Sequence, residues 1–173
     1  MTDDFAHRLR IDQIRDGQRL DLVAGEEECA AIAERLGLDS LDRLEAHVTL
    51  TRDGQSVRAE GRPGASLQQR CVITDEPVAS HADEPFAFTF IRAPAAAARD
   101  EEIELGSDEL DSIFYDGAEI DIGTAIADTL ALSIDPFPRS AGAEAALKEA
   151  GVMTEAEASP FAALARLRNN DET

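Results

Sequence analysis

The sequence predicts an α+β fold in which an antiparallel β-meander, open or curled toward a barrel, packs against helices. Two observations lead to this fold class. Apolar and polar residues alternate through most of residues 44–91, which is the period of a half-buried strand. Helical spacing of apolar residues appears instead on the two sides of this region, at residues 26–36 and 120–134. The sheet should therefore come mainly from residues 5–23 and 44–91.

The N-terminal region is predicted to form one or two short strands and then a helix. Residues 5–11 alternate in the manner of a strand, and Asp16-Gly17 is a turn signal. Residues 26–36 begin with three glutamates, which favour the positive end of a helix. Gly37 is a suitable helix end. The predicted buried stripe of this helix consists of Cys29, Ile32, Ala33 and Leu36.

The central region is predicted to be a series of antiparallel strands. Residues 44–51 alternate strictly, and Asp53-Gly54 predicts a hairpin turn into a second strand from Ser56. Pro63-Gly64 is expected to break the hydrogen-bond ladder of that second strand. A new alternation then runs from Leu67 through Cys71 to Ile73.

The next turn is predicted at Asp75-Glu76-Pro77, and residues 86–91 form a further strand with three phenylalanines on one face. Residues 93–111 combine a small-residue linker with acids, which predicts a mobile loop, and structure is expected to resume at Ile120. Asp121 should cap a helix that continues to Ile134. Two weaker helices are expected at residues 142–150 and from Ser159. We expect a single domain over residues 1–140 and a helical extension over residues 141–173.

Composition restricts the compartment and the kind of partner. Two cysteines do not make a disulfide framework, and the charged start has no signal-peptide pattern, so we expect a cytoplasmic protein without a membrane span. The net charge is −20, from 36 acidic and 16 basic residues. Such a charge opposes binding to phosphate backbones, although it also serves solubility alone.

Cys71 is the residue on which an enzymatic hypothesis depends. Sequence spacing brings none of the three histidines to Cys71, and a free cysteine is by default a small buried residue. Thr74 makes the local pattern C-x-x-T, and a neutral hydroxyl is a poor zinc ligand. The acidic clusters lack the spacing of a calcium loop. The sequence therefore predicts no enzymatic activity, no metal and no cofactor, with Cys71 facing the core from a strand.

Four segments in this order resemble a known family. They are "CAAIAERLGL" (29–38), "RCVITDEPV" (70–78), "EIDIGTAIADTLALSIDPFPR" (119–139) and "SPFAALARLR" (159–168). The set is similar to the YceD-like family, the large ribosomal RNA subunit accumulation proteins. The resemblance implies a cytoplasmic bacterial factor that supports the amount of large-subunit (23S) ribosomal RNA. Some relatives carry a second cysteine at the position of Thr74, so any metal binding by those relatives does not transfer to this chain.

The resemblance and the charge together predict how the protein acts. We expect contact with another protein of ribosome biogenesis, such as a basic ribosomal protein, because an acidic surface steers basic partners. The alternative is a direct RNA-binding module that uses a local arginine cluster. The candidate protein-contact residues are Asp100, Glu101, Glu102, Glu104, Asp108, Glu109, Asp111, Pro136, Phe137, Pro138 and Arg139. The candidate RNA contacts are Arg8, Arg10, Arg62 and Arg70.

Overall fold

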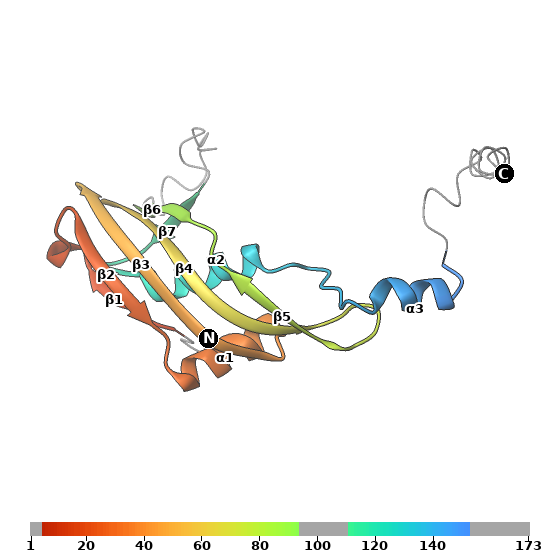
Figure 1. Cartoon of the computed structure of the whole chain (residues 1–173). Helices are drawn as coiled ribbons and strands as arrows, with labels where there is room; N and C mark the ends of the chain where they lie inside the picture. The colour runs from red at the N-terminus through yellow and green to blue at the C-terminus, as the bar shows by residue number, and fades with distance from the viewer. Residues whose placement is uncertain (1–4, 94–110, 153–173) are drawn as a thin grey trace, which may run out of the picture. The chain divides into compact units, whose positions relative to one another are not determined.

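The computed structural model of the chain describes residues 5–93 and 111–152 (Figure 1). Its α+β class confirms the prediction. The chain divides into two compact units, each described by itself below. The first consists of Met1–Gln69 with Ala79–Pro136, and the second of Arg70–Val78 with Phe137–Thr173.

The first unit opens with two short strands and a helix. Strand β1 is Arg8–Arg10, a 3-10 turn η1 follows at Ile11–Gln13, and β2 is Gln18–Val23. Helix α1 covers Glu26–Leu36, as predicted. The Glu28 carboxylate accepts a hydrogen bond from the Gly25 N–H at 2.7 Å and so satisfies an otherwise free donor at the helix start.

A long hairpin forms the centre of the first unit. Strands β3, Ser40–Asp53, and β4, Ser56–Arg70, pair antiparallel through a tight turn in which Gly54 has a φ of +60°. The expected break at Pro63-Gly64 is wrong, because β4 continues through both residues. Counted from the turn, Pro63 lies opposite Ala46 at a non-hydrogen-bonded position. The missing N–H of Pro63 therefore costs the ladder to β3 nothing.

Three further strands extend the sheet. They are β5, Pro77–Ala82, β6, Phe86–Arg92, and β7, Ser112–Tyr115. The sheet order is β2-β3-β4-β6-β7, and β5 also pairs with β4. Strand β7 is parallel to β6, so this pair departs from the predicted antiparallel meander. Since β2 and β7 are the ends of this order, the sheet is open within the described part of the chain.

After the residues that are not described, regular secondary structure begins again with β7 at Ser112, before the predicted Ile120. Strand β8, Glu119–Asp121, pairs with β1 in a separate two-stranded sheet and leads directly into helix α2, Ile122–Ser133. The Asp121 carboxylate accepts a hydrogen bond from the Thr124 N–H at 3.1 Å, which confirms the predicted cap. Helix α3, Ala143–Glu149, confirms the helix predicted at 142–150. The helix predicted from Ser159 lies outside the described residues.

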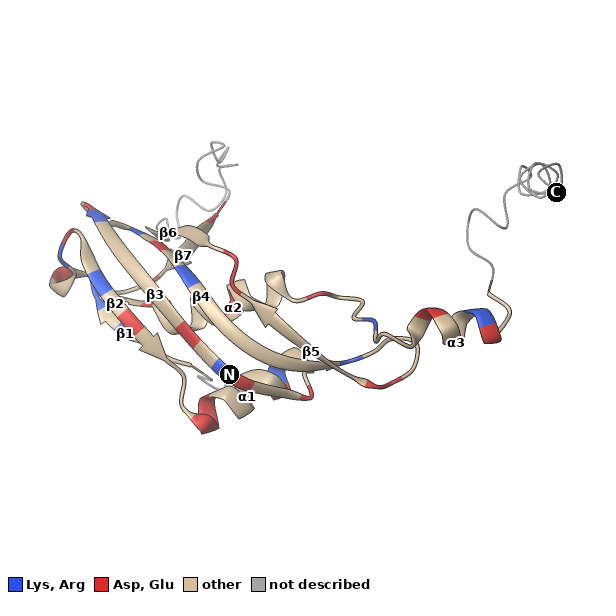
Figure 2. Cartoon of the chain, viewed as in Figure 1, with Lys and Arg blue, Asp and Glu red and all other residues tan. Residues whose placement is uncertain are grey.

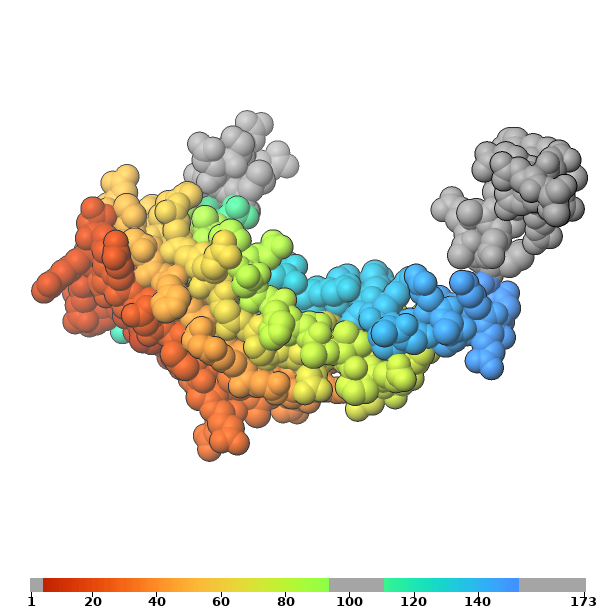
Figure 3. Space-filling model, viewed as in Figure 1, coloured from red at the N-terminus to blue at the C-terminus, as the bar shows by residue number. Residues whose placement is uncertain are grey.

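The two faces of the large sheet differ. The inner face packs with apolar residues of α1 and α2 into one core, in which Phe88 stacks on Phe86 and meets the edge of Phe90. The outer face carries the exposed polar residues of the central strands. Figure 3 shows residues of β2, β3 and β4 directly at the surface on the side facing the viewer. Within the described residues, this outer face is exposed.

Candidate functional site

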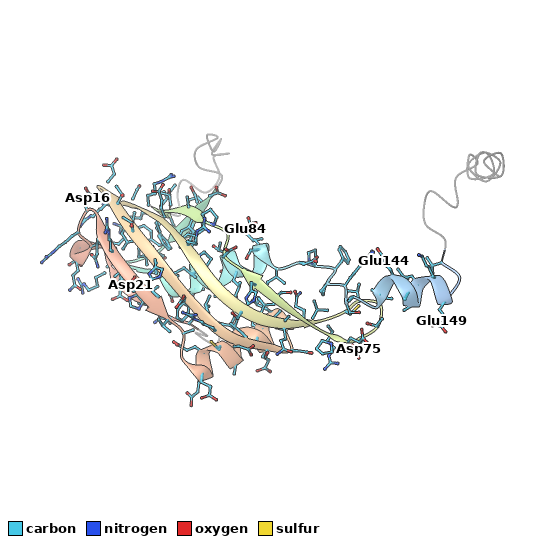
Figure 4. All side chains as sticks on the ribbon, in the orientation of Figure 1. Asp16, Asp21, Asp75, Glu84, Glu144 and Glu149 are labelled. Carbon is cyan, nitrogen blue, oxygen red and sulfur yellow. The ribbon has the colours of Figure 1, made fainter. Side chains whose placement is uncertain are left out.

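Cys71 lies in a turn of the second unit rather than within a strand. The expected alternation through Ile73 is wrong, because β4 ends at Arg70 and Ile73 is exposed. Cys71 itself is buried, with 3% of its surface exposed, as predicted. The Cys71 N–H donates to the Glu76 carbonyl at 2.8 Å, and Asp75 adopts a φ of +59°. The predicted turn at Asp75-Glu76-Pro77 is confirmed, and Figure 4 shows Asp75 between β4 and β5.

The Cys71 sulfur accepts hydrogen bonds from the backbone of its own turn. The N–H groups of Ile73 and Thr74 both lie 3.4 Å from the sulfur. Burial is the largest single influence on the Cys71 pKa and raises it. Hydrogen bonds from Thr74, Ser140 and Ile73 together outweigh burial and lower the pKa of Cys71 to about 6. The donors of this turn therefore favour the thiolate form of Cys71.

A second segment of the same unit packs beside this turn. The Val72 N–H donates to the Pro138 carbonyl at 3.0 Å, and the hydroxyl oxygens of Thr74 and Ser140 lie 3.0 Å apart. Hydrogen bonds from the Ser140 and Thr74 hydroxyls lower the pKa of the Glu76 carboxyl. These contacts join residues 71–76 to residues 138–140 through main-chain and hydroxyl groups.

This geometry bears on catalysis and on metal binding. The imidazole of His47 is 2.5 Å from Asp21, and that of His81 is 3.2 Å from the Ser66 hydroxyl, so each has a partner other than Cys71. In the parts of the chain that the structure describes, no three His, Cys, Asp or Glu side chains are grouped to hold a metal ion. His47 and His81 are thus each engaged by another side chain, and the described residues hold no such metal-binding group.

The predicted contact segment at residues 136–139 is partly exposed. Phe137 has 68% of its surface exposed, and Pro136 and Arg139 are also exposed. Pro138 is buried, and its carbonyl serves the Val72 hydrogen bond. Three of the four predicted residues are therefore accessible to a partner.

The predicted acidic contact residues lie largely beyond the described part of the chain. Of this set Asp111 is described, and it is exposed at the start of β7, where its carbonyl accepts a hydrogen bond from the Thr89 N–H at 2.9 Å. The other six residues of the set lie outside the described residues. They are Asp100, Glu101, Glu102, Glu104, Asp108 and Glu109.

The four predicted RNA-contact arginines are divided between two strands. Arg8 and Arg10 are on β1, Arg62 is on the outer face of β4, and Arg70 ends β4. Each of the four has an aspartate nearby, and Figure 2 shows acidic and basic positions interspersed along the strands. The nearest nitrogen–oxygen distances are 3.7 Å for Arg8–Asp121, 3.0 Å for Arg10–Asp12, 3.8 Å for Arg62–Asp83 and 3.5 Å for Arg70–Asp75.

One groove of the first unit was not anticipated from the sequence. A groove of about 780 Å³ lies between β6 and β7 on one side and β8 and α2 on the other. Phe114 of β7 and Leu132 of α2 are 51% and 89% exposed at this groove. The apolar run Ile113-Phe114-Tyr115 was the available signal, but it is too short to predict a strand beside an acidic segment.

Comparisons with known proteins identify the family. A family model described as "Large ribosomal RNA subunit accumulation protein YceD" matches residues 59–168, and the chain belongs to this YceD family. The recognition from sequence motifs is thereby confirmed. No curated protein and no solved structure matches the chain. Among the described helices, none has the length and apolar character that crossing a membrane requires.

Proposed function

We propose that this YceD-family chain supports large-subunit ribosomal RNA accumulation as a non-enzymatic factor that binds a basic protein of ribosome biogenesis. The family description links the chain to the accumulation of this RNA. The way in which it acts is inferred from its charges. The partner class is a ribosomal or RNA-processing protein rich in Arg and Lys, in keeping with a cytoplasmic site of action.

The pairing of the candidate arginines is the observation that carries this proposal. A protein gains affinity for RNA by neutralising phosphates with cations and releasing counterions. The guanidinium groups of Arg8, Arg10, Arg62 and Arg70 each lie within 4 Å of an aspartate. A phosphate would have to compete with that carboxylate. The net charge of −20 adds a long-range repulsion for RNA and a long-range attraction for a basic protein.

The Cys71 turn supports a non-enzymatic role. A catalytic thiolate needs access to a substrate, yet Cys71 is almost fully buried. Its sulfur accepts hydrogen bonds from two N–H groups of its own turn, which is the role of a structural anchor. Replacing Cys71 with Ser should weaken this turn without abolishing a chemical step.

Affinity purification of the full-length tagged chain tests the proposal. Lysates would be treated with ribonuclease or left untreated, then bound at about 50 mM and at about 300 mM salt, which differ strongly in screening length. We expect one basic protein of ribosome biogenesis to remain bound after ribonuclease and to weaken at the higher salt. Tight binding of purified large-subunit RNA, with no protein retained after ribonuclease, would contradict the proposal.

The outer face of the sheet favours direct RNA binding as a second candidate function. Among the described helices of the first unit, none covers this face, and Arg19, Arg58 and Arg62 all lie on it. A titration of the chain with large-subunit RNA at increasing salt tests this alternative. This alternative requires an affinity that falls steeply with salt. Arg62→Ala should weaken the affinity more than Arg35→Ala on α1, which is not among the candidate contacts.

A further inference from the structure

We propose that the groove between β7 and α2 binds an extended segment of a partner protein, apolar at its centre and cationic at its ends, as an added strand on β7. The inference rests on the proposed function and names the surface and the kind of segment involved. A groove bounded by an edge strand and a helix suits this mode of recognition, in which main-chain bonds hold a peptide and pockets select its side chains.

The edge of β7 provides the main-chain groups. Within the described residues the sheet order ends at β7. The carbonyls of Asp111 and Tyr115 accept hydrogen bonds from the N–H groups of Thr89 on β6 and of Ala93, which directly follows β6. The intervening residue Ile113 therefore also turns its main-chain groups toward β6. The N–H and C=O groups of Ser112 and Phe114 therefore point away from β6. These are the groups that an added strand would use.

The groove beside that edge provides the apolar surface. Phe88, Phe90 and Ile113 of the sheet and Ala125 of α2 line it, and Leu132 stands exposed at its border. This lining can receive alternate side chains of a strand bound to β7. The buried hydroxyl oxygen of Ser112, which also lines the groove, has no hydrogen-bond partner among the described residues. A bound peptide amide can supply this partner.

Charge selects the chemistry of the occupant. Among the described residues, the groove lining contains carboxylates and no Lys, Arg or His. Asp111 and Asp116 lie directly before and after β7. Asp128 of α2 also lines the groove, but its carboxylate is already paired with Arg35 at 2.6 Å, so the two aspartates that flank β7 carry the argument. A strand paired with β7 would therefore meet negative charge at both of its ends. An apolar centre with arginine or lysine at both ends is complementary to this arrangement, whereas an acidic segment is repelled.

Binding of synthetic peptides to the full-length chain is the direct test. The probe is a fluorescein-labelled peptide with the centre Val-Thr-Val-Leu and two arginines at each end, measured by fluorescence anisotropy. One matched peptide replaces the arginines with glutamates, and a second carries N-methyl groups at alternate central amides. We expect binding of the first peptide and losses of at least about tenfold for the other two, because charge attraction and main-chain pairing are both needed.

Protein variants place the binding site. Asp111→Lys should weaken binding about tenfold by changing attraction into repulsion, and Leu132→Ser about fivefold by removing apolar contact. Both side chains are exposed, so neither substitution should unfold the chain. Asp53→Lys in the β3–β4 turn is the matched control for the change of charge, and should bind like the unmodified chain. Equal binding by Asp111→Lys and Asp53→Lys would overturn the proposal.

Hydrogen exchange distinguishes strand addition from surface attraction. The bound peptide should slow exchange of the Ser112 and Phe114 amides, and unchanged exchange at both would overturn strand addition. Tighter peptide binding by the double variant Arg166→Glu/Arg168→Glu would assign the groove to the chain's own C-terminal segment and also overturn the proposal. If the peptide does not bind while the full chain still captures a basic protein, the groove proposal is wrong and the proposed function stands. If no basic protein is captured, the proposed function fails.

Discussion

Gly61 and Gly64 offer a paired test of how closely β3 and β4 approach. Both glycines lie on β4, three residues apart. A Cβ atom placed on Gly61 would lie 2.9 Å from Phe86 Cζ and would collide with the main-chain carbonyl oxygen of His47. A Cβ placed on Gly64 would have its nearest neighbours in the Glu45 side chain, at 3.4 Å. The first obstacle is backbone in the middle of a ladder, and the second is a flexible side chain.

The expected magnitudes follow from these neighbours. Gly61→Ala must move a ladder carbonyl and a packed phenylalanine, which places it at the upper end of overpacking costs, about 3 kcal/mol of the free energy of unfolding. Gly64→Ala restricts the unfolded chain and meets an adaptable neighbour, so its effect should lie within about 1 kcal/mol of zero. With a urea m-value of about 2 kcal/mol/M, Gly61→Ala lowers the unfolding midpoint by about 1.5 M.

Urea unfolding followed by circular dichroism measures both variants under the same conditions. The comparison is informative because the chemical change is identical and the two sites share one strand. Midpoints for the two variants that agree within about 0.3 M would refute the described β3–β4 approach at Gly61. A larger decrease in the unfolding midpoint for Gly64→Ala than for Gly61→Ala would also refute the described β3–β4 approach.

Three further predictions concern single side chains. In a Cys29→Ser background, Cys71 should ionise with a midpoint near pH 6 in a thiolate absorbance titration. Because the pKa of Cys71 is lowered by folding, the stability that the Cys71 thiolate contributes should be lost as pH falls through about 6. Asp121→Ala should destabilise the chain by about 1–2 kcal/mol in urea, because the cap of α2 is lost, while Asp121→Asn should retain part of it. The hydrogen bond to Asp21 raises the pKa of His47, so Asp21→Asn should lower the His47 midpoint in an NMR titration. The small stabilisation from this exposed pair should be lost as pH rises through the raised pKa of His47.

The elements with strong local patterns were predictable from the sequence. Helix α1 has a three-glutamate start and a glycine end, and it was placed at the correct residues. The same holds for the β3–β4 turn, whose Asp53-Gly54 signal is local. Pro63 was misjudged because the effect of a proline in a strand depends on which side its missing N–H would face. That side is set by register, which the residues around Pro63 do not encode locally.

The candidate sites were less accessible to sequence reasoning. Two of the four arginines have aspartate partners that are distant in sequence, Asp83 for Arg62 and Asp121 for Arg8, and no local pattern predicts these pairs. The partners of the other two, Asp12 and Asp75, lie only two and five residues away. The groove depends on a parallel pairing between β6 and β7, and parallel partners are separated by a long connection. No local period signals such a contact. Burial of Cys71 was predicted from alternation, whereas its ionisation arises from hydrogen bonds that form only in the folded turn.

The Cys71 turn shows why Thr74 matters beyond metal chemistry. A thiolate that is almost fully buried requires donors, and the N–H groups of Ile73 and Thr74 supply them within three residues. A second thiolate at position 74 would place another negative charge beside the first, in a turn that already holds the Glu76 carboxylate 3.0 Å from Thr74 Oγ1. The neutral Thr74 hydroxyl instead donates to Glu76 or pairs with Ser140. The residue pattern of this chain is therefore consistent with a turn that its own hydrogen bonds hold together.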